Sequence, residues 1–562
     1  MTNPTLHFIG MRRTSVTVAV AAVLSACGGS GGGNVPVACE SITTESLRLP
    51  GIKVSSSTTV PEKSDGTATE NYPAHCKVTG TLNERTGIDG KPYAIGYEVR
   101  MPTTWNGKFL YQGGEGTDGV LAPALGKLWN TDSNALRQGY AVVSSDGGHA
   151  TGQADATFGL DPQARTDYGY NAVGSVTPAA KQIVKLAYGR APERSYFLGC
   201  SNGGRGAMVA ASRFADQFDG LVAGNPGYDL PKAALQQVWD TQQFMQAAGT
   251  GSLPKDAFPQ ASMDFVAGRI LARCDALDGA ADGIVQNRTA CQAAFDFARD
   301  VPACTGGATA DCLPPVQKNA LQKVFDGVKN SAGERLYTNF PWDPGVAGAN
   351  WRFWKLEAAP IAPLPFNTLI GAGAVGYIFT TPPEAPPLAD AGVGYQLQFN
   401  MDTDAPKIFG RSSVFKESAL EFMNPPDPKL SALKSRGGKL IVYHGTADPV
   451  FSAHRSIEWY QALAAGDANA SAYARLFLVP GMNHCNGGPT TDRFNMLAAL
   501  ERWVEQGQAP DQVIARVNPA DPDVQQRNWP ANRSRPLCTY PRQASLKAGA
   551  QDLESAESFI CQ

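Results

Sequence analysis

A serine and a histidine that lie far apart in this chain each stand beside a cysteine. Ser201 occupies the centre of the pattern G-x-S-x-G at residues 199–203, directly after Cys200. His484 directly precedes Cys485. If the serine is a nucleophile and the histidine its base, the two cysteines come within disulfide range. One bridge would then hold both halves of the catalytic pair together.

The G-x-S-x-G pattern predicts a nucleophile elbow only in the right context, because a serine there is also typical of a helix N-cap. The apolar run 196–199 predicts a strand before the serine, and the residues after Gly203 predict a helix. A strand, a sharp turn and a helix together expose a serine hydroxyl at the edge of a sheet. We therefore interpret Ser201 as a nucleophile.

A serine hydroxyl becomes nucleophilic when a histidine, oriented by a carboxylate, takes its proton. On the fold that uses this elbow the chain order is serine, acid, histidine. Asp448 follows the predicted strand 439–443, and His484 follows the predicted strand 475–479. We predict that Ser201, Asp448 and His484 form a catalytic triad.

Five other histidines compete for the role of the base. They are His7, His75, His149, His444 and His454. We interpret them as polar surface or loop residues, because His484 alone follows the last predicted strand of the sheet.

Acyl transfer also needs hydrogen-bond donors for the developing oxyanion. The residue after the nucleophile, Asn202, supplies one backbone N–H, and the loop after an early strand supplies the other. Residues 113–116 (Gly-Gly-Glu-Gly) follow the predicted strand 108–111, and we assign the second donor to Gly116. The alternative interpretation of this loop is an ordinary turn.

Short apolar runs alternate with segments of helical spacing on both sides of a long middle region. The runs predict strands at 108–111, 140–143, 195–198, 221–223, 439–443 and 475–479, and the helical segments lie at 179–188, 204–214, 456–464 and 494–505. This alternation predicts an α/β-hydrolase fold, with a doubly wound, mostly parallel sheet covered by helices. Residues 227–428 are proline-rich and predict an inserted lid domain, so the catalytic domain comprises 39–226 and 429–562.

The first 27 residues have the character of an export signal. Arg12 and Arg13 precede an apolar run at 16–24, and Leu-Ser-Ala-Cys at 24–27 resembles a bacterial lipobox. We expect Cys27 to carry a lipid anchor and the glycine-rich segment 28–38 to be a tether; a plain secretory signal is the alternative. The protein is thus expected to be exported, as an outer-membrane lipoprotein or as a secreted or periplasmic protein.

Ten cysteines remain after Cys27, and an even number in an exported chain favours five disulfides. Proximity suggests the pairs Cys39–Cys76, Cys274–Cys291, Cys304–Cys312 and Cys538–Cys561, which leaves Cys200 with Cys485. The sequence does not fix this pairing, and free buried thiols are the alternative.

Composition narrows the classes of partner. The chain has 562 residues, a net charge of −3 and no block of lysine and arginine. A basic footprint for nucleic acid and a basic membrane-surface helix are therefore both excluded. We expect a monomer that acts on a small molecule and contacts a membrane only through the anchor.

An acidic loop in the middle region contains potential ligands for a hard cation. Its candidate ligands are the carboxylates of Asp275, Asp278 and Asp282 and the backbone carbonyls of Ala280 and Ile284. Oxygen ligands of this kind suit Ca²⁺, which we expect to stabilise the lid without taking part in the chemistry. A metal-free acidic turn is the alternative, and no organic cofactor is expected.

Three further segments carry a resemblance to a known family. They are residues 85–90 (RTGIDG), 158–165 (FGLDPQAR) and 476–485 (LFLVPGMNHC). With the serine and histidine motifs, they resemble the tannase and feruloyl esterase family of α/β-hydrolases over nearly all of the mature chain. The resemblance implies a disulfide between the residues beside serine and histidine, and a calcium loop in the lid.

The resemblance also implies contacts to a substrate ring. Phe451 corresponds to an aromatic residue that packs on the ring, and Trp354 to a lid tryptophan that faces it. Family members that cleave a terephthalate monoester grip its free carboxylate with a lid arginine, where this chain has Phe366. Because residues 366–380 contain no arginine or lysine, the resemblance implies weaker action on that monoester.

The expected function is hydrolysis of small aromatic acid esters by a serine carboxylic-ester hydrolase, with mono(2-hydroxyethyl) terephthalate as the first candidate substrate. A feruloyl or gallate esterase acting on plant phenolic esters is the alternative within the same chemistry. From another class, a surface-displayed binding protein without catalysis would retain the fold alone.

Overall fold

The computed structural model describes residues 36–562, apart from 153–154 and 306–310. The predicted signal segment with Cys27, and the tether up to residue 35, lie outside the described residues. No helix in the described part of the chain is both long enough and apolar enough to cross a membrane.

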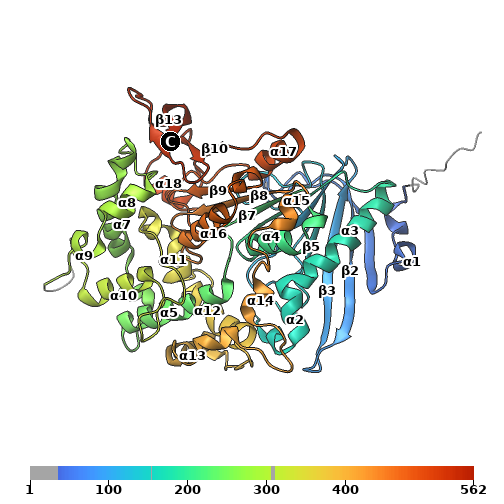
Figure 1. Cartoon of the computed structure of the whole chain (residues 1–562), viewed down its shortest axis with the longest axis horizontal. Coiled ribbons are helices and arrows are strands. Elements are labelled where there is room, and N and C mark those ends of the chain that lie inside the picture. Colours follow the sequence, from blue (N-terminus) through green and yellow to red (C-terminus); the bar gives the residue numbers. More distant parts are fainter. Residues whose placement is uncertain (1–35, 153–154, 306–310) are drawn as a thin grey trace, which may run out of the picture.

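A nine-stranded sheet lies at the centre of the catalytic part (Figure 1). In spatial order its strands are β1 (Ile52–Val60), β2 (His75–Thr86), β3 (Pro92–Pro102), β5 (Ala141–Ser145), β4 (Lys108–Gln112), β6 (Arg194–Cys200), β7 (Gly220–Gly224), β8 (Lys439–Gly445) and β9 (Ala474–Val479). The last six strands in this order, β5, β4, β6, β7, β8 and β9, pair in parallel. They correspond to the six strands expected from the sequence. The parallel strands are apolar and buried, as strands covered on both faces must be.

Three antiparallel strands, β1 to β3, form the other edge of the sheet and are not among the strands expected from the sequence. The outermost strand, β1, is rich in serine and threonine, and most of its residues are partly or fully exposed. Its pattern therefore lacks the continuous apolar run that identifies a buried parallel strand. These strands extend the sheet on the side remote from the serine.

Helices cover both faces of the sheet, which confirms the doubly wound α/β-hydrolase architecture. On one face, α3 (Ala172–Tyr188), α4 (Asn202–Arg213) and α16 (Ala453–Gly466) share a core with the strands. On the other face, α17 (Met496–Gln506) packs against residues of β5 to β9. These four helices correspond to the four helical segments expected from the sequence.

Between β7 and β8 the chain leaves the sheet and forms a largely helical region. Its elements are α5 (Leu230–Ala248), α6 (Pro254–Ala257), α7 (Gln260–Cys274), η5 (Asp275–Asp278), α8 (Arg288–Ala294), α9 (Phe297–Asp300), α10 (Pro315–Asp326), η6 (Pro344–Ala347), α11 (Ala349–Lys355), α12 (Phe366–Gly373), η7 (Ala374–Phe379), η8 (Ala389–Gly392), α13 (Val393–Gln398), η9 (Ala405–Phe409), α14 (Ala419–Met423) and α15 (Ser431–Ser435). Most of its helices lie beyond one end of the sheet, opposite β1 to β3 (Figure 1). We keep the name lid for residues 227–428; its boundaries remain a prediction.

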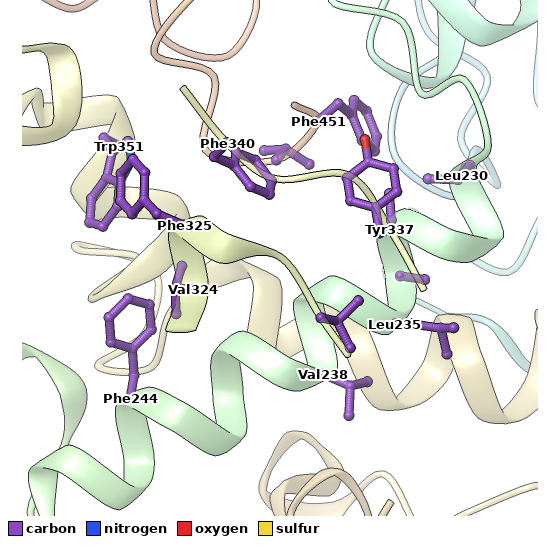
Figure 2. Packing of buried hydrophobic residues seen from close by; sticks show 14 of the residues in the cluster. Leu230, Leu235, Val238, Phe244, Val324, Phe325, Tyr337, Phe340, Trp351 and Phe451 are labelled. Atoms are coloured by element: carbon purple, nitrogen blue, oxygen red, sulfur yellow. The ribbon is translucent and has the colours of Figure 1, made fainter. Parts of the chain in front are cut away.

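The lid has a core of its own that reaches the loop after β8. In Figure 2, Phe244 of α5 lies near Val324 and Phe325 of α10, and Phe451 lies at the other end of the same cluster. A shared core of this kind fixes the lid against the loop that carries Asp448, because buried side chains pack at the density of a crystal.

Shorter elements complete the fold. They are η1 (Cys39–Ser41), α1 (Thr44–Leu47), η2 (Thr157–Leu160), α2 (Pro162–Thr166), η3 (Asp167–Asn171), η4 (Ala215–Gln217), η10 (Ala470–Ala472), β10 (Gln512–Arg516), α18 (Pro522–Gln526), β11 (Ser534–Cys538), β12 (Ala544–Leu546), η11 (Ala556–Ser558) and β13 (Phe559–Cys561). Strands β10 and β11 form one small sheet, and β12 and β13 form another.

Five disulfides join the ten cysteines in the expected pairs. They are Cys39–Cys76, Cys200–Cys485, Cys274–Cys291, Cys304–Cys312 and Cys538–Cys561. The Cys200–Cys485 bridge spans 285 residues of sequence and ties the end of β6 to the loop after β9. By contrast, the Cys304–Cys312 bridge spans only 8 residues.

Replacing Cys200 and Cys485 together by alanine should destabilise the protein and lower its yield of active enzyme. A long closed loop restricts the unfolded chain strongly, and losing such a bridge costs roughly 2–5 kcal/mol. The matched control is Cys304→Ala with Cys312→Ala, which opens a short loop and should lower the Tm less. Equal melting temperatures for the two double variants, measured by calorimetry, would contradict the claim that the long bridge contributes more to stability than the short one.

Candidate active site

Ser201 sits on a sharp turn between β6 and α4. Its backbone has φ 61° and ψ −124°, a conformation that residues with a side chain rarely adopt. The turn depends on two glycines: a Cβ on Gly199 would lie 2.5 Å from the backbone of Gly203, and one on Gly203 would lie 2.7 Å from the carbonyl oxygen of Gly114. Glycine is thus required at both ends of the G-x-S-x-G pattern, and the 113–116 loop lies against the elbow.

The three residues expected to form a triad meet at the carboxyl edge of the sheet. The Nε2 atom of His484 lies 2.9 Å from the Oγ atom of Ser201. On the other side of the ring, Nδ1 lies 2.9 Å from Oδ2 and 3.1 Å from Oδ1 of Asp448. Because a carboxylate only accepts, the ring carries its proton on Nδ1, and Nε2 can accept the serine proton.

The carboxylate of Asp448 is buried but well satisfied. Its Oδ1 accepts hydrogen bonds from the backbone N–H groups of Val450, at 2.7 Å, and Phe451, at 3.1 Å. Burial by itself would raise the pKa of this carboxyl, but the positive charge that His484 carries once it has taken a proton, and hydrogen bonds from His444 and His484, hold the pKa well below its usual range. Asp448 therefore remains a carboxylate that can orient and stabilise the imidazole.

Asn225, directly after the end of β7, is a site residue that was not expected from the sequence. Its fully buried side chain donates from Nδ2 to Oδ2 of Asp448, at 2.6 Å, and to the carbonyl oxygen of Asn483, at 3.1 Å. Asn483 immediately precedes His484, so one amide group connects the acid to the histidine loop. The available signal was position alone, because Asn225 follows a parallel strand just as Asp448 does.

The interpretation of the remaining histidines as surface or loop residues was wrong for His75 and His444, which lie buried in strands, whereas His149 lies in a loop but is buried there. His444 lies beneath Asp448: its Nε2 is 2.9 Å from the carbonyl oxygen of Phe451 and 3.3 Å from Oδ2 of Asp448. Since a carbonyl only accepts, Nε2 bears the proton, and Nδ1 accepts from Ser456 at 2.8 Å. His444 thus orients both the acid and the Phe451 backbone.

The two residues expected to hold the oxyanion belong to adjoining segments. The side chain of Asn202 donates to Oδ2 of Asp118 at 3.2 Å, and this contact links the loop after β4 to the elbow. The hydroxyl of Tyr168 donates to the carbonyl oxygen of Gly116 at 3.1 Å. Within the described ranges, the backbone N–H groups of Asn202 and Gly116 have no protein acceptor. Both are therefore free to donate to a ligand.

The aromatic residues expected at the substrate surround the imidazole. Phe451 and Trp354 each meet the ring of His484 edge to face, with centroid distances of 5.4 and 5.0 Å. Phe366 meets Trp354 edge to face at 4.8 Å and stacks on Phe353 at 5.2 Å. Phe451 is buried in the lid core, whereas Trp354 and Phe366 are partly exposed. The partly exposed lid aromatic next to His484 is therefore Trp354, and Phe366 extends the apolar surface from Trp354.

The acidic loop expected to bind calcium lies at the end of α7. Its three carboxylates accept hydrogen bonds from backbone N–H groups of the same loop. Asp275 accepts from Asp282 and Gly283, Asp278 accepts from Ala280 and Gln286, and Asp282 accepts from Ile284. Burial, together with the neighbouring Asp282 and Asp275, raises the pKa of Asp278 to about 6. Arg535 forms an ion pair with Asp282. No cluster of three or more His, Cys, Asp or Glu side chains among the described residues is arranged to hold a metal ion.

Replacing Asn225 by alanine should lower kcat/KM by roughly 10–100-fold, because a hydrogen bond to a charged group contributes about 1.5–3 kcal/mol. The loss should fall on kcat more than on KM, since the side chain acts on the acid and the histidine loop. Asn424→Ala is the matched control, because Asn424 donates to Asp229 and does not contact the triad. Steady-state kinetics that show the same activity for the two variants would contradict a positioning role for Asn225.

Comparisons with known proteins agree with this geometry. The family described as "Tannase and feruloyl esterase" matches residues 76–562. The chain is 43% identical over 520 residues to a mono(2-hydroxyethyl) terephthalate hydrolase of Piscinibacter sakaiensis, covering 87% of this chain and 85% of the relative. It is 29% identical to a probable feruloyl esterase of Arthroderma benhamiae, covering 86% and 85% of the two chains.

Solved structures support the fold. The crystal structure of feruloyl esterase B from Aspergillus oryzae superposes with a TM-score of 0.73 at 22% identity, covering 93% of this chain and 99% of that chain. From the family match and the similarity to the terephthalate relative, the chain belongs to the tannase and feruloyl esterase family.

Proposed function

We propose that this protein is a serine carboxylic-ester hydrolase that cleaves small aromatic acid esters. The single observation that carries the proposal is the continuous contact from Asp448 through His484 to Ser201, with 2.9 Å on each side of the imidazole. A buried carboxylate, an imidazole and a hydroxyl in this order are suited to nucleophilic acyl transfer.

Each residue has a defined chemical task in the proposed reaction. The Oγ atom of Ser201 attacks the ester carbonyl while Nε2 of His484 takes its proton. The N–H groups of Asn202 and Gly116 stabilise the tetrahedral oxyanion. The imidazolium then protonates the leaving alcohol, which departs and leaves an acyl-serine. His484 next takes a proton from water, which attacks the acyl group. The imidazolium then returns this proton to Oγ of Ser201 as the aromatic acid leaves.

An ester panel tests the proposal. The protein should hydrolyse aromatic acid esters such as mono(2-hydroxyethyl) terephthalate, methyl ferulate and methyl gallate, and a fluorophosphonate probe should label it. Ser201→Ala should abolish both labelling and hydrolysis. The control is Ser212→Ala, because Ser212 lies near the end of α4 and outside the site. This variant should keep both labelling and hydrolysis. Labelling that persists in Ser201→Ala would exclude this serine as the nucleophile.

The lid wall favours an uncharged aromatic acyl group. Trp354 presents its ring beside His484, and Phe366 packs against Trp354. The lysine next in sequence to Trp354, Lys355, is buried in an ion pair with Asp240. A free carboxylate would lose its hydration against such a wall without gaining a charged partner, which is costly. We therefore propose that a neutral or phenolic ester is turned over better than the terephthalate monoester.

Replacing Phe366 by arginine should raise the preference for the terephthalate monoester over methyl benzoate. A charge-assisted hydrogen bond contributes about 1.5–3 kcal/mol, so the ratio of the two kcat/KM values should rise by about tenfold or more. Phe366→Leu serves as the uncharged control and should leave this ratio within about twofold. An unchanged ratio in the arginine variant would place Phe366 away from the substrate acid group.

A feruloyl or gallate esterase is the second candidate, because the family and the probable feruloyl esterase relative both carry that name. The ester panel separates the two candidates by the ratio of ferulate and gallate hydrolysis to terephthalate hydrolysis. A binding protein without catalysis would hydrolyse none of these esters.

We propose that the acidic loop holds a structural Ca²⁺. What supports this is charge: three partly buried carboxylates lie close enough for Asp275 and Asp282 to raise the pKa of Asp278. The ion would compensate this charge, with Asp275, Asp278 and Asp282 as its side-chain ligands and Ala280 and Ile284 as its carbonyl ligands.

Millimolar CaCl₂ should raise the Tm by about 2 °C or more over the value in EGTA, because a ligand of the folded state stabilises it. Asp278→Asn should lose this shift, whereas the control Asp552→Asn, on the surface, should keep it. Identical melting curves with calcium and with EGTA would exclude a structural ion here.

Five disulfides support export to an oxidising compartment. We propose further that Cys27 anchors the protein through a lipid and that the protein is a monomer. Mass spectrometry of the mature N-terminus and sedimentation of the detergent-extracted protein test these two points.

A further inference from the structure

A cavity of about 30 Å³ lies behind the two loops that carry Asp448 and His484. Its wall includes Thr446 and Pro480, which begin those loops, and Gln286, Arg288 and Arg542 from elsewhere in the chain. This volume has room for one or two water molecules or one small ion. The cavity is separate from the reacting groups, since Ser201, Asp448 and His484 do not line it.

Arg288 is a cation without a countercharge. Burial lowers its pKa, yet a guanidinium does not lose its proton in a protein. No carboxylate among the described residues forms an ion pair with it. Its hydrogen-bond partner is Nε2 of His454, at 3.3 Å, and burial and the nearby Arg288 lower the pKa of that imidazole to about 4. His454 is therefore neutral near pH 7 and supplies no negative charge.

Gln286 adds an unused donor to the same cavity. Its side chain is 5% exposed, and its Nε2 atom has no hydrogen-bond partner among the described residues. A buried amide without a partner costs about 1–3 kcal/mol, so such groups are rare unless a ligand or water completes them. The second arginine, Arg542, is exposed and pairs with Asp511 at 3.3 Å.

The sign of the charge identifies the class of ligand. Among the described residues no acidic residue lines the cavity, whereas two arginines do. A desolvated cation and an unpaired N–H₂ group together favour an acceptor that carries negative charge, because charge-assisted hydrogen bonds are about twice as strong as neutral ones. Water would satisfy the amide but would leave the guanidinium uncompensated.

We propose that this cavity binds a small inorganic anion, held by Arg288 and Gln286. The anion sits where both catalytic loops begin. The backbone N–H of Thr446 donates to the carbonyl oxygen of Val479 at 3.0 Å. Its hydroxyl donates to Oδ2 of Asp343 at 2.6 Å and accepts from the N–H of Gly481 at 3.0 Å, so the cavity wall is also the junction of the two loops. Occupancy therefore stabilises this junction without contacting the substrate.

The proposal is tested by measuring the Tm at constant ionic strength. Sodium gluconate, whose anion is too large for the cavity, is the reference salt, and sodium chloride or sodium phosphate replaces it stepwise. The Tm should rise by on the order of 1–2 °C and saturate with the concentration of chloride or phosphate. Arg288→Gln should raise the apparent Kd about tenfold or more, and Gln286→Leu should raise it less. Arg436→Gln, an exposed arginine remote from the cavity, should behave as the wild type.

Crystals grown in sodium bromide give a readout that does not depend on how well the variants fold. An anomalous peak within hydrogen-bond distance of the Arg288 guanidinium is expected. The proposal is overturned if gluconate stabilises the protein as much as chloride and phosphate do, or if Arg288→Gln keeps the saturable shift. A bromide peak without saturable stabilisation would mean an adventitious ion only and would also overturn it.

Discussion

The arrangement of the site depends on keeping one charged carboxylate inside the protein. Asp448 is almost fully buried, and a buried charge is tolerated only when it is paired and hydrogen-bonded. Two backbone N–H groups, the amide of Asn225 and two imidazoles meet this need. The same contacts fix the direction in which Asp448 faces His484. The same set of hydrogen bonds therefore compensates the buried charge and fixes the catalytic geometry.

These contacts come from different parts of the chain, and the sheet brings them together. Parallel strands end at one edge, so the residues that follow β6, β7, β8 and β9 become neighbours. Ser201, Asn225, Asp448 and His484 each follow one of these four strands. The Cys200–Cys485 bridge adds a covalent constraint between the first and the last of them. The lid contributes aromatic side chains to this edge and shares its core with Phe451 (Figure 2).

The sequence was sufficient where the chemistry is local or the order along the chain is informative. Ser201 was identified from its glycines and its strand, and Asp448 and His484 from their places after apolar runs. The disulfides followed from proximity and from the pairing that the catalytic hypothesis required. The parallel strands were found because complete burial leaves continuous apolar runs, whereas the half-exposed β1 has no such pattern.

Other parts could not be predicted because they depend on neighbours in space. Asn225 contacts Asp448 only after β7 and β8 pair, and His444 contacts it only after the turn that follows β8 forms. Nothing in their local sequence marks them as its partners. The aromatic wall of the lid was assigned by resemblance alone, since aromatic residues are more often core than binding surface. The proposed substrate preference depends on the same kind of spatial neighbourhood, because the proposal assigns the contact with a free carboxylate to a single lid side chain, Phe366.

The most direct measurement is a crystal structure of the protein inactivated with an organophosphonate, which resembles the tetrahedral intermediate. The account predicts phosphorus bonded to Oγ of Ser201 and a phosphoryl oxygen about 3 Å from the N–H groups of Asn202 and Gly116. Phosphorus bonded to another residue, or a phosphoryl oxygen turned away from both N–H groups, would contradict it.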